Sequence, residues 1–103
     1  MFDSSTTIDE LETRLLAHER TISRHRAAQL ELIRALDQAQ VASGDGCRTM
    51  VEWVSGRLDV EPITALALVN TARNTASNEP LVTALAEATA SFDRVAATAR
   101  LRA

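Results

Sequence analysis

Glycine and proline are scarce in this chain of 103 residues, and residues 1–43 contain neither. These two residue types are the usual interruptions of a helix. Their absence predicts one amphipathic helix from Ile8 to about Ala42, roughly 50 Å long. A compact domain of this size has a radius of gyration of only about 13 Å. The helix must therefore project from its own chain or pack against another chain, unless it breaks where the sequence shows no breaker.

Cysteine and long apolar runs are also scarce. The single cysteine, Cys47, excludes an internal disulfide framework and fits a reducing compartment, so we expect a cytoplasmic protein. No apolar run approaches the ~18 residues that a membrane span needs. The first residues lack the basic and apolar regions of a signal peptide, so we expect none, and no contact with a membrane.

Aromatic residues and alternating β-branched residues are few, which excludes most β-rich folds. The chain has one Trp, two Phe and no Tyr, and 46% of its residues are hydrophobic. We predict an all-α fold with one core. A long helix within residues 1–43 would be followed by a compact bundle of about four short helices in residues 44–103, together forming one structural domain.

Apolar residues in the long helix recur at alternating spacings of three and four, which is typical of the a and d positions of a coiled coil. The repeat, which we call the seam, consists of Ile8, Leu11, Leu15, His18, Ile22, His25, Gln29, Leu32, Leu36 and Ala39. We predict a homodimer interface on Leu11, Leu15, His18, Ile22, His25, Leu32 and Leu36. Because Leu16, Leu30 and Ile33 widen the stripe, packing within one chain is the alternative interpretation.

Local signals place the ends of the helices. Hydroxyl residues at 4–7 can cap the first helix, Ser43–Gly46 ends it, and Thr49 with Glu52 has the form of a capping box for a helix to about Leu58. Pro62 suits the first position of a helix over 62–75, which is apolar nearly all round and is expected to be buried. A helix over 80–89 and a last helix capped by Ser91 would follow.

Residues that could perform catalysis or bind a metal do not cluster in the sequence. His18 and His25 are about 10 Å apart along one helix, too far for one metal within a chain. Across a dimer they could pair, bind zinc or sense protonation, and the simpler interpretation is that they fix the register of a helical interface. Cys47 has no neighbouring ligand, and the spacing of Trp53 is that of a core residue. We expect no enzyme, no cofactor and no metal site.

Two features bear on nucleic acid, although the net charge of −3 argues against a dedicated binder. Arg20, Arg24 and Arg34 lie away from the seam on a helical wheel, so they form either a solvated face or a set of phosphate contacts. Residues 49–73 have the outline of a helix-turn-helix, but Asp59 replaces the usual glycine and Thr64 is the only polar base-reading candidate. We therefore expect that pair of helices to be structural.

Two stretches, Gly46–Val54 with Leu58–Pro62 and then Ala88–Leu101, resemble an actinobacterial domain of unknown function. That domain commonly forms the N-terminal part of mycobacterial REP-family proteins and of related phage proteins, many of which carry an HNH endonuclease domain near the C-terminus. The resemblance covers nearly the whole chain and implies a non-catalytic helical part of a nuclease-associated protein. It transfers no catalytic residue, because the histidines and asparagine of an HNH site have no counterpart here.

These observations favour a helical module for dimerisation and weak, sequence-indifferent DNA association beside a nuclease domain or partner protein. A protein–protein interaction or regulatory domain without DNA contact is the alternative.

Overall fold

The computed structural model describes residues 7–75, 83, 87 and 91–102. The helices in these ranges are α1 (Ile8–Gln38), α2 (Val41–Gly44), α3 (Met50–Leu58), α4 (Pro62–Asn74) and α6 (Phe92–Arg102). No strand occurs within the described ranges, and the fold is all-α, as the sequence predicts. The predicted helix over 80–89 lies outside the described residues.

The starts of the helices follow local rules. The Oγ1 of Thr7 accepts the backbone N–H of Glu10 at 3.1 Å, and the Oγ1 of Thr49 accepts that of Glu52 at 3.1 Å. Pro62 occupies the first turn of α4, and Ser91 caps α6 in the same way as the two threonines. Each cap satisfies one of the donors that a helix leaves unpaired at its N-terminus.

The end of the long helix differs from the prediction. α1 stops at Gln38 rather than near residue 42, because Gln40 adopts a left-handed conformation with φ 59°. That conformation costs a non-glycine residue about 1–2 kcal/mol. The turn redirects the chain into α2 and brings Ala42 into the core, where it is buried. Burial of α2 against the other helices therefore outweighs the local preference for a continuous helix.

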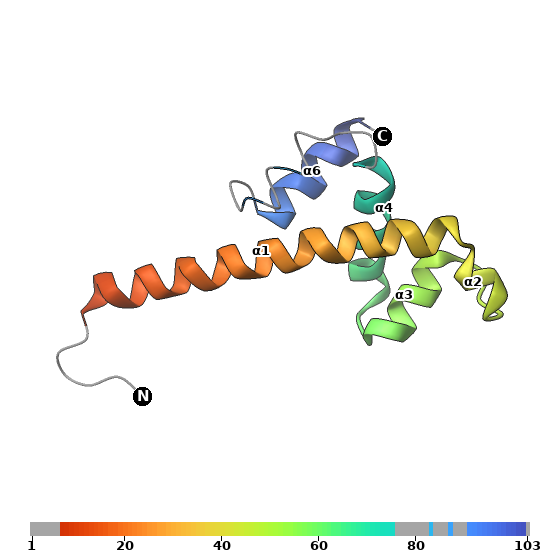
Figure 1. Cartoon of the computed structure of the whole chain (residues 1–103), viewed down its shortest axis with the longest axis horizontal. Coiled ribbons are helices and arrows are strands. Elements are labelled where there is room, and N and C mark those ends of the chain that lie inside the picture. The colour runs from red at the N-terminus through yellow and green to blue at the C-terminus, as the bar shows by residue number, and fades with distance from the viewer. Residues whose placement is uncertain (1–6, 76–82, 84–86, 88–90, 103) are drawn as a thin grey trace.

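Helix α4 is the centre of the packing. It contacts α1, α3 and α6, and in Figure 1 it crosses α1 with α3 and α6 on opposite sides of the long helix. Ala65, Leu68 and Val69 on its inner face are completely buried. The expectation of burial all round is wrong for the outer face, where Ile63 and Leu66 are 77% and 45% exposed.

The N-terminal half of α1 projects from this packing, as Figure 1 shows. The residues of α1 that are buried begin only at Ser23. The principal extents are 55 × 29 × 19 Å, and the radius of gyration of 16.3 Å exceeds the roughly 13 Å typical of a compact chain of this length. We call α2, α3, α4 and α6 together the compact part.

Candidate interaction surface

Helix α1 carries two separate apolar faces. The buried face that packs on the compact part consists of Ser23, Ala27, Leu30 and Ile33. At about 100° per residue, the seam lies roughly a third of a turn away from it. The prediction that Leu30 and Ile33 allow packing within the chain is confirmed, and this packing uses a face that leaves most of the seam uncovered.

Most members of the seam from Ile8 to Leu32 are exposed, and the exceptions are the half-buried Leu11 and Gln29. Ile8, Leu15, Ile22 and Leu32 are 80%, 69%, 53% and 63% exposed, which is unusual for large aliphatic side chains at regular spacing. In the single chain, this stripe leaves an apolar surface in contact with water.

The polar and terminal members of the seam differ in their surroundings. His18 and His25 are exposed, and Leu11 is half-buried. Gln29 is also half-buried, and its Oε1 accepts a hydrogen bond of 2.6 Å from Arg26 Nη1. Leu36 packs against the core of its own chain. We therefore remove Leu36 from the candidate interface, because the compact part already covers it.

The three arginines considered for phosphate contact do not share one environment. Arg20 and Arg24 are exposed on successive turns near the middle of α1, on the side roughly opposite to the seam. Arg34 is half-buried at the junction of α1 with α4 and α6, and it already has an interaction partner. Arg20 and Arg24 are therefore the better placed pair for contact with a polyanion.

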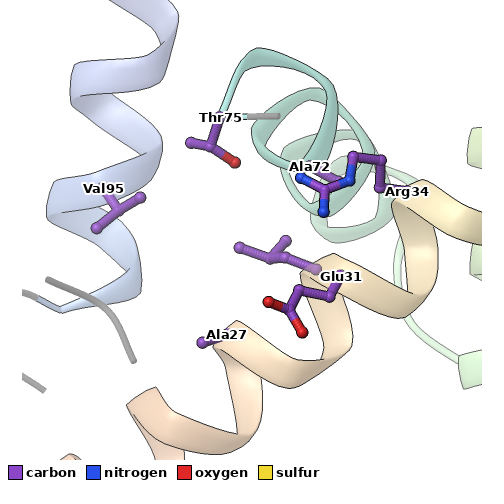
Figure 2. Close-up of a pocket in the computed structure, with 7 residues that line it drawn as sticks. Ala27, Glu31, Arg34, Ala72, Thr75 and Val95 are labelled. Carbon is purple, nitrogen blue, oxygen red and sulfur yellow. The ribbon is translucent and has the colours of Figure 1, made fainter. Parts of the chain in front are cut away.

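Figure 2 shows the hollow beside Arg34, where Ala27 of α1 faces Thr75, directly after α4, and Val95 of α6. Its volume is about 10 Å³, close to the minimum for a single water molecule. The hydroxyl of Thr75 is already satisfied, since it donates to the carbonyl of Thr71 at 2.6 Å. This hollow is a packing gap between three helices rather than a ligand site.

A wider groove of about 700 Å³ lies where the end of α1 meets α2, α3 and α4. At its edge Arg73 donates to both carboxylate oxygens of Asp37, at 2.7 and 3.0 Å. The hydrogen bonds from Arg73 hold the pKa of Asp37 below its usual value, although partial burial acts in the opposite direction. The pair connects α1 to α4, and its separation of 36 residues made it invisible to sequence patterns.

Trp53 combines a core contact with a polar contact. Its ring is half-buried against the core, while its indole N–H donates to Asp45 Oδ2 at 2.7 Å. Arg57 Nη2 donates to the same oxygen at 2.8 Å and its guanidinium lies 5.0 Å from the Trp53 ring centre. These contacts fix the loop after α2 to α3, which agrees with a structural role for Trp53.

The helix pair α3–α4 turns at Asp59, which takes the left-handed conformation, φ 54°, that a glycine usually provides. Ser55 Oγ donates to the carbonyl of Val60 at 2.7 Å and so closes the turn. Thr64 is exposed, but its neighbours on the outer face are the apolar Ile63 and Leu66. Such a face offers few donors or acceptors for reading base edges.

Groups of three or more His, Cys, Asp or Glu close enough to hold a metal do not occur in the described part of the chain. The side chains of His18 and His25 are exposed, and Cys47 is a free, half-buried thiol. None of the described helices is long and apolar enough to cross a membrane. Comparison with protein-family models, curated proteins and solved structures finds no match to the chain.

Proposed function

We propose that this chain is a non-catalytic, cytoplasmic helical module that forms a homodimer through the seam and associates weakly with DNA. The observation that carries the proposal is the exposure of Ile8, Leu15, Ile22 and Leu32 along the seam. Full burial of each aliphatic side chain would contribute about 1.5–3 kcal/mol. Part of that gain is offset by the loss of translational freedom and of side-chain entropy on association.

A second copy of the chain fits this surface because the seam has the spacing of a coiled coil. From Ile8 to Leu32 it covers roughly three and a half heptads, within the three to four heptads that indicate a coiled coil. Buried polar residues such as His18 and His25 would lower the affinity but fix the alignment of the two helices. The homodimer is therefore expected to be specific and of moderate strength.

A matched pair of substitutions tests the dimer. Ile22→Asp places a carboxylate in the seam, whereas Ala17→Asp places one on an exposed position outside it. An unpaired buried charge is costly, so Ile22→Asp should yield monomers in sedimentation velocity and Ala17→Asp should remain dimeric. Equal behaviour of the two variants would count against the seam.

Weak DNA association is the second part of the proposal. Arg20 and Arg24 point away from the seam, so a dimer would carry two such pairs on opposite sides of its paired helices. Arginine contacts to phosphates position a protein on DNA without reading its sequence. Micromolar or weaker, salt-sensitive binding is therefore expected.

The DNA part is tested by titrating a labelled duplex at about 50 and 200 mM salt. Replacing Arg20 and Arg24 together with Ala should lower the affinity and flatten the salt dependence while the dimer persists. Arg94→Ala, which removes one exposed arginine from α6, serves as the control. Binding that survives the double change but is lost with Thr64→Ala would instead favour the helix-turn-helix interpretation.

The alternative is a protein-interaction module without DNA contact, and the exposed Ile63 and Leu66 on α4 favour it. The resemblance to the N-terminal domain of nuclease-associated proteins supports a partner of that kind, either a nuclease domain or a separate nuclease. Absence of duplex binding at about 50 mM salt together with an intact dimer would select this alternative.

A further inference from the structure

The polar residues of the seam distinguish the two directions in which two copies of α1 can pair. In a parallel, in-register pair each of His18, His25 and Gln29 meets its own counterpart in the second copy. In an antiparallel pair that aligns Ile8 with Leu32, His18 meets Ile22 and His25 meets Leu15. Polar groups that meet each other can exchange hydrogen bonds, whereas polar groups against aliphatic side chains lose those made to water.

Charges beside the seam distinguish the directions independently. Arg14 and Glu19 occupy the g and e positions that flank the seam, five residues apart. A parallel pair brings Arg14 of each copy to Glu19 of the other, which gives two symmetric ion pairs. Arg14 already has a partner in its own chain, but a guanidinium has five N–H donors and can also donate to a second carboxylate. The antiparallel pair would instead bring Glu19 against its own copy.

The position of the compact part gives a third argument about the direction of pairing. It packs against the side of α1 that carries the e positions of the heptad. Ile33 on that flank is buried, and the guanidinium of Arg26 lies 5.2 Å from the ring centre of Phe92 on α6. In a parallel pair the facing g residues of the second copy are Thr21, Ala28 and Ala35, all exposed and small. The second helix would therefore present only small side chains to the compact part.

We propose that two copies of this chain pair as a parallel, in-register coiled coil over Ile8–Leu32, with both compact parts at the same end. This inference rests on the dimer proposed above and adds its direction and alignment. It also places the two Arg20–Arg24 pairs at the same height along the paired helices, where one duplex could reach only one of them at a time.

Cysteine cross-linking tests the direction. In a Cys47→Ser background, Leu15→Cys places a thiol at a seam position that meets its own copy only in the parallel pair, within the 4.4–6.8 Å Cα separation that suits a disulfide. Since Leu15 is exposed in the monomer, the change leaves the core intact. Oxidation should give a covalent homodimer, and Ile8→Cys should do the same.

The antiparallel pair predicts a different product. A mixture of Leu15→Cys and His25→Cys chains, both in the Cys47→Ser background, would then form the mixed disulfide and neither homodisulfide. That result, in a sample that sedimentation shows to be dimeric, would overturn the direction while leaving the dimer in place. A monomeric wild type would overturn the dimer and the direction together.

The flanking charges give a second test that does not depend on oxidation. Arg14→Glu should weaken the dimer by about tenfold, because two ion pairs become two repulsions. Adding Glu19→Arg in the same chain should restore the wild-type dissociation constant. If Arg14→Glu has no effect, the parallel alignment is wrong, since in the antiparallel pair Arg14 faces the small side chain of Ala28.

Discussion

The two halves of α1 belong to one continuous helix, yet they meet their surroundings with different residues. From Ser23 to Ile33 the inward residues include the small Ser23 and Ala27, which allow close approach of the compact part. Between Ile8 and Ile22 the stripe consists of Leu and Ile with one histidine, His18, and none of these residues is buried. The contact within the chain thus combines these small residues with Leu30 and Ile33, whereas the large aliphatic residues from Ile8 to Ile22 are left largely uncovered.

A pair of leucine substitutions would sharpen this contrast most. Leu68→Ala removes a completely buried side chain of α4 and should lower the free energy of unfolding by about 2–5 kcal/mol. Leu15→Ala should change the stability of the monomer by less than about 0.5 kcal/mol. Urea denaturation followed by circular dichroism, at concentrations too low for dimers, measures both. Similar losses in the two variants would show that the N-terminal half of α1 packs within its own chain.

The ion pair between Asp37 and Arg73 should contribute less, because Arg73 is half exposed and such pairs are worth about 0–1 kcal/mol. The folded-state pKa of Asp37 lies below its unfolded value. The contribution is therefore complete above the unfolded pKa of about 4 and is lost as the pH falls through the folded pKa.

Denaturation of wild type and Asp37→Asn from neutral pH downwards checks this prediction. The difference in unfolding free energy should be largest near neutral pH and should shrink below about pH 4. Arg73→Gln should show a loss of the same size, and the double variant no further loss. A difference that persists unchanged in acid would mean that Asp37 acts through packing rather than charge.

The smallest expected effect is on nuclease activity. Both histidines are exposed on α1, and no group of three or more possible metal ligands occurs in the described part of the chain. Purified chain with magnesium, manganese or zinc should not cleave duplex DNA above the level of a buffer control. Cleavage that disappears with His18→Ala or His25→Ala would show that α1 carries an active site.

The features that the sequence predicts well are local. Thr7, Thr49 and Ser91 each accept an N–H three residues ahead, and Pro62 opens α4, because caps depend only on neighbouring residues. The all-α fold follows from spacing alone. The division of the helix into two faces was only partly predictable, since Leu30 and Ile33 could equally have widened one stripe.

The features that sequence patterns missed depend on long-range packing. The turn at Gln40 has no glycine or proline to announce it, and it exists because Ala42 gains burial. The contact of Asp37 with Arg73 joins residues 36 positions apart. Leu36 has the same seam spacing as Leu15, and only the placement of the compact part assigns it to the core rather than to an interface.

The most direct test of the central claim is the mass of the wild-type chain in solution. Light scattering after gel filtration, at tens of micromolar, should give about twice the chain mass of 11.2 kDa, because the uncovered seam is proposed to bind a second copy. The mass should fall toward one chain on dilution or with Ile22→Asp. A wild type that remains at 11.2 kDa over this concentration range would contradict the account.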